Sequence, residues 1–182
     1  MAYRLALARP ADIDELAALV NSAYRGDSSR IGWTTEADFL GGQRTDSTRL
    51  TDDVRCPERA ILCAREVRDG PILGCVSLEF LPSDRGGGCH LGMLTVKPAL
   101  QSKGLGRAIL EEAERFARQR GAMHMTLGVI QLRDTLMEWY RRRGYAPTGE
   151  TRPFPYGDEA FGLPLRDDLH FVMFEKSLAD PG

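Results

Sequence analysis

The chain has few cysteines and histidines, and none of them are spaced as metal ligands. Its 182 residues include four cysteines and three histidines. The cysteines show no C-x-x-C pairing, and a chain of this length does not depend on a disulfide framework. We therefore expect no metal site, free thiols and a reduced, cytoplasmic location.

Excess charge of one sign and long apolar runs are also missing. The 24 basic residues nearly balance the 26 acidic ones, so no overall field draws the protein to nucleic acid or anionic lipid. No apolar run approaches the length of a membrane span, and the first residues lack the pattern of a secretory signal. With 42% hydrophobic and 27% charged residues, the composition is that of a globular protein. We expect one soluble domain over residues 1–182, with no nucleic-acid or membrane partner.

Apolar periodicity predicts the order of the elements. Alternating or β-prone runs predict strands, and helical spacing predicts three main helices. The strands are expected at 3–7, 60–67, 72–80, 90–96, 124–129, 145–150 and 169–174, and the helices at 13–24, 104–120 and 132–143. The segments 25–58, 83–88 and 151–168 are rich in glycine, proline and polar residues and should form loops and short helices. This order indicates a mixed α/β domain.

The segment from Val96 to Arg107 carries the clearest chemical signal. It places a strand, a proline stop and a glycine-rich turn directly before a helix. The first amides of a helix have no internal partner and lie at the positive end of its dipole, so they bind phosphate oxygens. Gly104 and Gly106 remove the side chains that would block a pyrophosphate, and Lys103 adds positive charge. The segment is therefore a candidate phosphate-binding turn.

Other nucleotide-binding and hydrolase motifs do not fit this chain. A dinucleotide fingerprint needs a third small residue where Ile109 stands. The phosphate loop of the NTPases needs a Gly-Lys-Ser/Thr ending, which the sequence lacks. A G-x-S-x-G nucleophile elbow is also missing.

The turn resembles that of the GNAT superfamily of acyl-CoA-dependent N-acetyltransferases. The superfamily motif V-x-P-x-x-Q/R-x-x-G-x-G/A matches residues 96–106 at every specified position. A second family feature, a strand and a helix ending near Tyr and then Gly-Phe/Tyr, matches residues 127–129 and 139–145. The resemblance covers nearly the whole chain. It implies a splayed, mostly antiparallel sheet flanked by helices, with acetyl-CoA bound between the strands 90–96 and 124–129.

The resemblance also implies which residues contact acetyl-CoA. The pantetheine arm would lie along Leu94, Thr95 and Val96. The pyrophosphate would lie on the turn, formed by Gln101, Ser102, Lys103, Gly104, Leu105, Gly106 and Arg107. One departure is Arg133, which stands where the family often has Asn. Its guanidinium could bind a phosphate or a substrate carboxylate, or it could be an exposed arginine on the first turn of a helix.

For catalysis, the resemblance implies direct transfer of the acetyl group in a ternary complex. Tyr140 matches the family tyrosine and is our candidate for the acid that protonates the departing thiolate. Two residues are alternatives for the general base: Glu79, near a strand end, and His90, whose offset from Val96 matches the base of histone-acetylating relatives. We also expect a backbone amide near Leu94 to act as the oxyanion donor.

The acceptor should bind between the segments 25–58 and 151–168, because specificity usually resides in loops. Phe154, Tyr156 and Phe161 are candidate walls of that pocket, or aromatic plugs that anchor the loop. The proline-rich loop favours a covered pocket and hence a small-molecule amine. A protein or peptide acetyltransferase, and a non-catalytic acyl-CoA-binding module, are the alternatives, and a homodimer is left open.

Overall fold

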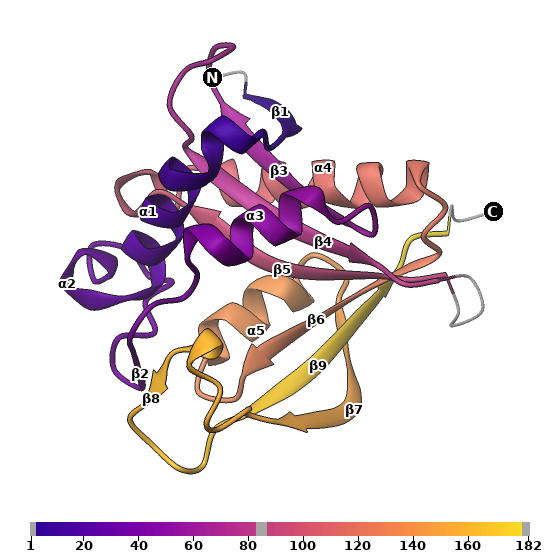
Figure 1. Ribbon diagram of the computed structural model, residues 1–182. Helices are drawn as coiled ribbons and strands as arrows, with labels where there is room; N and C mark the ends of the chain where they lie inside the picture. Colours follow the sequence, from indigo (N-terminus) through magenta and orange to yellow (C-terminus); the bar gives the residue numbers. More distant parts are fainter. Residues whose placement is uncertain (1–2, 83–86, 180–182) are drawn as a thin grey trace.

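A seven-stranded sheet forms the centre of the protein in the computed structural model, which describes residues 3–82 and 87–179 (Figure 1). The strands follow the order β1-β3-β4-β5-β6-β9-β7 across the sheet. Their bounds are β1 Arg4–Leu7, β3 Arg59–Arg65, β4 Gly74–Phe80, β5 Cys89–Val96, β6 His124–Ile130, β7 Ala146–Pro153 and β9 His170–Ser177. Every predicted strand has its counterpart here, and β9 extends three residues beyond its predicted end. The predicted loop 83–88 lies mostly outside the described residues.

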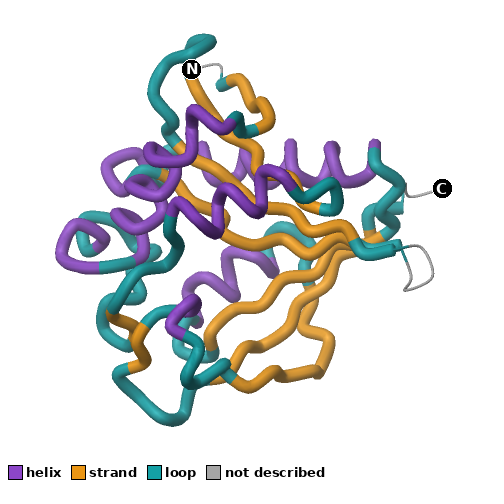
Figure 2. The backbone as a smooth tube through the Cα atoms, in the orientation of Figure 1, coloured by secondary structure: helices purple, strands orange, loops and turns teal. Residues whose placement is uncertain are grey.

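The sheet opens between β5 and β6. These two strands form the single parallel pair of the sheet, and they pair only at Cys89 with Met125 and at His90 with Thr126. Beyond these positions the strands diverge, as the backbone trace in Figure 2 shows. The predicted fold class, a mixed and mostly antiparallel splayed sheet with flanking helices, is therefore confirmed.

Helices cover both faces of the sheet. On one face, α1 (Ile13–Tyr24) and α3 (Ser47–Arg55) pack on β3 and β4 around Leu16, Leu50 and Ile61. On the other face, α4 (Leu105–Gln119) and α5 (Asp134–Arg141) bury their apolar sides in the main core. The remaining short helices are α2 Gly26–Ser29, η1 Pro10–Asp12, η3 Pro98–Leu100 and η4 Glu159–Phe161. No helix within residues 3–82 and 87–179 is long and apolar enough to cross a membrane.

The helix boundaries follow the expected signals with two differences. Gly121 follows α4 in a left-handed conformation (φ 85°), as its position after the helix predicts. Helix α5 begins only after Arg133, whose backbone (φ −106°, ψ 56°) is not helical. Asp12 stands at the predicted start of α1 but does not cap it. Its buried carboxylate instead pairs with Arg65, 2.7 Å away, and accepts a hydrogen bond from the backbone N–H of Arg9.

The two long irregular segments, 25–58 and 151–168, are joined by a pair of short strands. The short strands β2 (Leu40–Gly41) and β8 (Leu163–Pro164) pair antiparallel and join segment 25–58 to segment 151–168. Phe39, Leu40, Ile130, Phe154 and Leu169 form a small apolar cluster beneath this contact. The two segments therefore form one wall beside the open end of the sheet (Figure 1).

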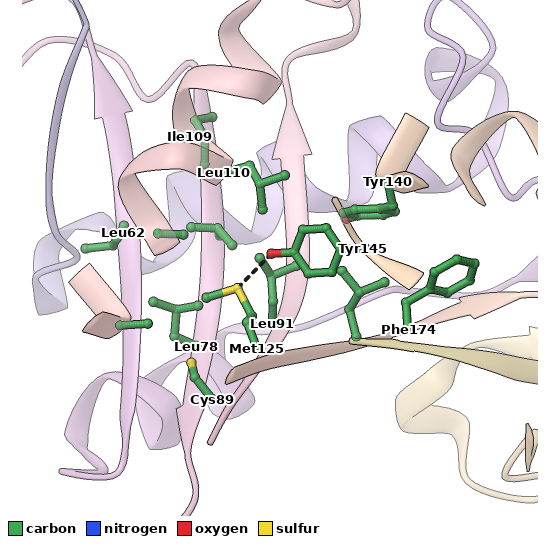
Figure 3. Close-up of a cluster of buried hydrophobic side chains, with 14 of the residues drawn as sticks. Leu62, Leu78, Cys89, Leu91, Ile109, Leu110, Met125, Tyr140, Tyr145 and Phe174 are labelled. Atoms are coloured by element: carbon green, nitrogen blue, oxygen red, sulfur yellow. Dashed lines mark hydrogen bonds between the residues drawn. The ribbon is translucent and has the colours of Figure 1, made fainter. Parts of the chain in front are cut away.

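The main core holds Tyr140, in the last turn of α5, through its neighbour Tyr145. Side chains of β4, β5, β6 and α4 surround Tyr145, whose hydroxyl donates to Glu114 and contacts the Met125 sulfur, each at 3.1 Å (Figure 3). The ring of Tyr140 packs edge-on against that of Tyr145, with 5.5 Å between the ring centres. Tyr140 is thus held by the core on one side.

Candidate active site

Two cavities meet beside the opening of the sheet. The strand cavity, about 370 Å³, is lined by β5, β6, the end of α1 and residues of the segments 25–44 and 152–161. The turn cavity, about 420 Å³, is lined by the end of β5, the turn before α4 and one side of α5. Five residues line both cavities: Tyr24, Leu94, Arg133, Leu136 and Tyr140. The two cavities therefore share one junction, built by α1, β5 and α5.

The turn cavity has the features of an anion site. Gly104, in the left-handed conformation (φ 87°), turns the chain into α4, and a Cβ there would meet no atom within 4 Å. The unpartnered amides of the first turn of α4 thus begin at an open surface. Arg107, Arg142 and Arg143 add positive charge to the lining. Such a lining suits a phosphate group.

Arg143 gives the most direct sign that an anion belongs in the turn cavity. Its guanidinium carbon lies 3.6 Å from the centre of the Trp139 ring. Its Nε is buried and has no hydrogen-bond partner within the described residues. Burial lowers the pKa of Arg143, and the neighbouring charges of Arg142 and Arg107 lower it further. The residues present therefore fit the phosphates of a coenzyme A molecule.

Most residues predicted to contact acetyl-CoA lie along the turn cavity. They are Leu94, Val96, Gln101, Ser102, Gly104, Gly106, Arg107 and Arg133. Three others do not line it: Thr95 is buried with its hydroxyl bonded to the Met93 carbonyl, Leu105 is buried in the core, and Lys103 is exposed. The side chain of Gln101 accepts from the Trp33 N–H and donates to Thr34 Oγ1, both at 2.8 Å. It therefore holds the segment 33–34 over the turn.

A bulge in β5 shapes the junction. Cys75 pairs with Thr95 but Ser77 pairs with Gly92, so β5 has one extra residue here, and Met93 takes a positive φ of 51°. The Tyr24 hydroxyl donates to the carbonyl of Leu94 at 2.5 Å. Burial raises the pKa of both Tyr24 and Tyr140. Both phenols therefore keep their protons at neutral pH.

The two candidate bases lie in different surroundings. His90 lines the strand cavity, and its Nδ1 is 3.1 Å from Thr126 Oγ1. Burial lowers the pKa of His90 below its ordinary value, which favours the neutral ring. Glu79 pairs with His90 across β4 and β5, but its side chain is half exposed and lines neither cavity. The fold thus brings His90 and Tyr140 to one cavity and leaves Glu79 outside it.

Two of the three aromatic residues predicted as walls of the acceptor pocket line the strand cavity, and one does not. Phe154 and Phe161 line the strand cavity. Tyr156 does not; its hydroxyl accepts from the Leu169 N–H at 2.8 Å, and its ring packs edge-on against Phe154. Tyr156 therefore anchors the loop that carries the other two rings.

Among the residues of the strand cavity that sequence reasoning missed are Tyr24, Arg25, Glu36 and Arg44. Glu36 lies between two arginines, with its carboxylate 2.5 Å from Arg25 Nη1 and 3.3 Å from Arg133 Nη1. Tyr24 continues the apolar face of α1, so its spacing in the sequence indicates a core residue and gives no sign of a site. The others come from an irregular segment in which no spacing marks a site. No group of three or more His, Cys, Asp or Glu side chains within residues 3–82 and 87–179 could hold a metal ion.

Comparison with known proteins identifies the family to which the chain belongs. Residues 17–145 match the Acetyltransferase (GNAT) family. The chain belongs to this family. The GNAT protein is 36% identical over 85 residues to an amino-acid acetyltransferase of Pseudomonas putida KT2440, covering 47% of this chain and 18% of the relative. It is 39% identical over 56 residues to the streptothricin acetyltransferase of Streptomyces lavendulae, covering 31% of this chain and 30% of the relative. The matches thus span less than a third of either relative.

Solved structures agree on the fold of this GNAT protein. YncA of Salmonella typhimurium, a structure with acetyl-CoA, matches with a TM-score of 0.70 at 17% identity and covers 100% of this chain and 97% of its own. The ribosomal-protein-S18-alanine N-acetyltransferase of Escherichia coli gives 0.70 at 12% identity, with the same coverage. At these identities the structures establish the fold alone.

Proposed function

We propose that this GNAT protein transfers the acetyl group of acetyl-CoA directly to the primary amine of a small molecule. The observation that carries the proposal is the junction of the two cavities at Tyr140. The turn cavity has a candidate phosphate-binding turn and arginines in its lining, and Arg143 Nε has no hydrogen-bond partner within the described residues. The other has a neutral histidine and apolar walls. A donor and an acceptor bound in the two cavities would meet at this junction.

Acetyl-CoA supplies the acetyl group as a thioester. The amides before α4, with Arg107, Arg142 and Arg143, would hold its phosphates, and the end of β5 at Leu94 and Val96 would bind the pantetheine arm. Bulged strands expose backbone groups that regular pairing would use, so the backbone amide near Leu94 is the oxyanion donor in this proposal.

His90 accepts the proton of the attacking amine. An alkylamine with a pKa of about 10.4 is about three units from its neutral form at pH 7, which costs roughly 4 kcal/mol without a base. A neutral imidazole in the same cavity accepts the proton that the nitrogen loses as it attacks the thioester carbonyl. In the tautomer whose Nδ1–H donates to Thr126 Oγ1, 3.1 Å away, Nε2 has the lone pair that receives the proton.

Tyr140 donates the proton that the departing thiolate sulfur needs. Its raised pKa keeps the hydroxyl protonated, and the core contact with Tyr145 fixes its ring. Tyr24, whose hydroxyl bonds the Leu94 carbonyl, is a positioning residue that holds the bulge beside it.

A protein substrate is the alternative acceptor, and a ribosomal-protein acetyltransferase shares the fold. A protein acetyltransferase needs an open groove for a chain segment. The paired strands β2 and β8 join the two segments that line the strand cavity, which favours a small molecule.

The test is the release of thiol from acetyl-CoA by the purified protein. Separate pools of polyamines, amino acids, aminoglycosides, arylamines and peptides are supplied as acceptors. We expect turnover with one small-molecule pool and a loss of about 100-fold in kcat with Tyr140→Phe, at unchanged acetyl-CoA affinity. Full activity of Tyr140→Phe would refute the assigned acid. Tight acetyl-CoA binding without turnover by any pool would favour a non-catalytic binding module.

A further inference from the structure

The strand cavity carries more positive than negative charge. Arg25, Arg44 and Arg133 line it, and Glu36 is the one acidic residue among the described lining residues, so these four groups carry a net charge of about +2. Arg152 also lines the cavity but pairs with Glu150 at 2.8 Å. Since burial favours the neutral form of His90, the imidazole adds no compensating or further charge.

Arg133 has an unused donor in this cavity. Its side chain is only 7% exposed, and its Nη2 has no hydrogen-bond partner within the described residues. A buried charged donor without an acceptor is costly, so such groups usually have one when the site is filled. Within the part of the chain that the structure describes, its guanidinium contacts Glu36, which lines the strand cavity and not the turn cavity. Arg133 itself lines both cavities, and the contact with Glu36 places one end of its guanidinium beside the carboxylate of the strand cavity.

Glu36 cannot satisfy Arg133 fully, because it is engaged by a second arginine. Its Oε2 lies 2.5 Å from Arg25 Nη1, whereas Arg133 Nη1 is 3.3 Å from Oε1. Arg25 in turn donates to the Phe161 carbonyl at 3.2 Å and so is tied to the wall of the cavity. Arg44 forms no ion pair within residues 3–82 and 87–179; its guanidinium carbon lies 5.8 Å from the Tyr24 ring centre. Two guanidinium groups thus remain for an anion.

We infer that the acceptor is an amino carboxylate with an apolar side chain, whose carboxylate binds Arg133 and is attracted by Arg44. This assignment rests on the proposed function and names its substrate class. A planar guanidinium matches a carboxylate with two parallel hydrogen bonds. The rest of the lining, including Leu40, Phe154, Phe161 and Met173, suits an apolar side chain. The amine then remains for His90 and Tyr140.

The test is equilibrium binding to the protein loaded with CoA, measured by isothermal titration calorimetry. The probes are L-phenylalanine, L-leucine and L-methionine, each compared with its amide and with its decarboxylated amine. The amine nitrogen is less basic in the amide and more basic in the decarboxylated amine than in the amino acid. A preference over both analogues therefore cannot result from amine protonation. We expect at least one amino acid to bind about tenfold or more tightly than both of its analogues.

Three variants assign the preference to Arg133. Arg133→Gln should reduce the preference to within about twofold at saturating CoA, with CoA affinity titrated separately because Arg133 also lines the turn cavity. Arg133→Lys should restore part of the preference because it keeps the charge without the planar fork. Arg141→Gln is the matched control on α5, since Arg141 is exposed, pairs with Glu138 and lines neither cavity. It should keep the full preference. If Arg133→Gln does not fold, the lysine variant gives the result.

Three outcomes would overturn the assignment. They are equal binding of the amino acids and their analogues, no binding of any amino acid at millimolar concentration, and a full preference in Arg133→Gln. Acetyl transfer to amines regardless of a carboxylate would leave the proposed function intact and refute this inference. Carboxylate-dependent binding without any acetyl transfer would refute the proposed function and leave the assigned carboxylate site intact.

Discussion

His90 and Glu79 are direct neighbours across two strands, yet of the two only His90 lines the strand cavity. Glu79 lies at the surface beside Arg59, 3.8 Å away, and it affects His90 through its charge, which raises the pKa of the imidazole. Burial and the charge of Arg152 lower that pKa by more. The ring is therefore neutral at a lower pH than an ordinary histidine, whose pKa is about 6.5.

The dependence of kcat on pH tests this assignment. Because the neutral form is active, kcat should fall on acidification with a midpoint below about 6.5. His90→Gln should remove this step and lower kcat by about 100-fold. Glu79→Gln should keep the step but move it to lower pH, since it removes the charge that raises the pKa of His90. A step that persists in His90→Gln, or disappears in Glu79→Gln, would contradict the assignment.

Among the elements, the loop 154–165 depends on one glycine. Gly162 has a φ of 99°, and a Cβ there would lie 2.8 Å from the Gly41 carbonyl oxygen and 3.0 Å from Arg25 Nη2. Gly162→Ala should therefore push the loop away from β2 and Arg25. We expect a loss of about 2–3 kcal/mol in the free energy of unfolding and a raised KM for the acceptor, with the KM for acetyl-CoA unchanged.

Gly157→Ala is the matched control in the same loop. Gly157 also has a positive φ, 88°, but a Cβ there would meet nothing within 4 Å. Gly157→Ala should lower the free energy of unfolding only by the backbone strain, about 1 kcal/mol, and leave the KM for the acceptor unchanged. Thermal unfolding and steady-state kinetics measure both effects. Equal behaviour of the two variants would show that the contact with Arg25 and β2 is unimportant.

Elements whose signals are local could be predicted from the sequence, and those held by tertiary contacts could not. The turn before α4 is specified within a dozen residues by Pro98, Gly104 and helical periodicity, and the fold contains it as predicted. The contact of Arg133 with Glu36 joins residues 97 apart in the sequence, so no spacing announces it. Nor did the segment 25–58 indicate β2, because a two-residue strand exists only through its pairing with β8.

For the whole molecule, the site depends on the separation of β5 from β6. Two pairs of residues hold these strands together at one end, and the strands diverge beyond them (Figure 2). Residues of β5 line both cavities. Helix α5 lies beside this opening and supplies Tyr140, and Arg133 directly precedes the helix (Figure 1). The fold thus brings the strand cavity and the turn cavity together at one junction.

The most direct test of this account follows the acetyl group itself. The purified protein is incubated with acetyl-CoA labelled with ¹³C in the acetyl group and with the amine pools, and the products are identified by mass spectrometry. The account predicts a small amine that carries the labelled acetyl group on its nitrogen, formed only when the protein is present. Bound acetyl-CoA with no labelled amine from any pool would contradict it.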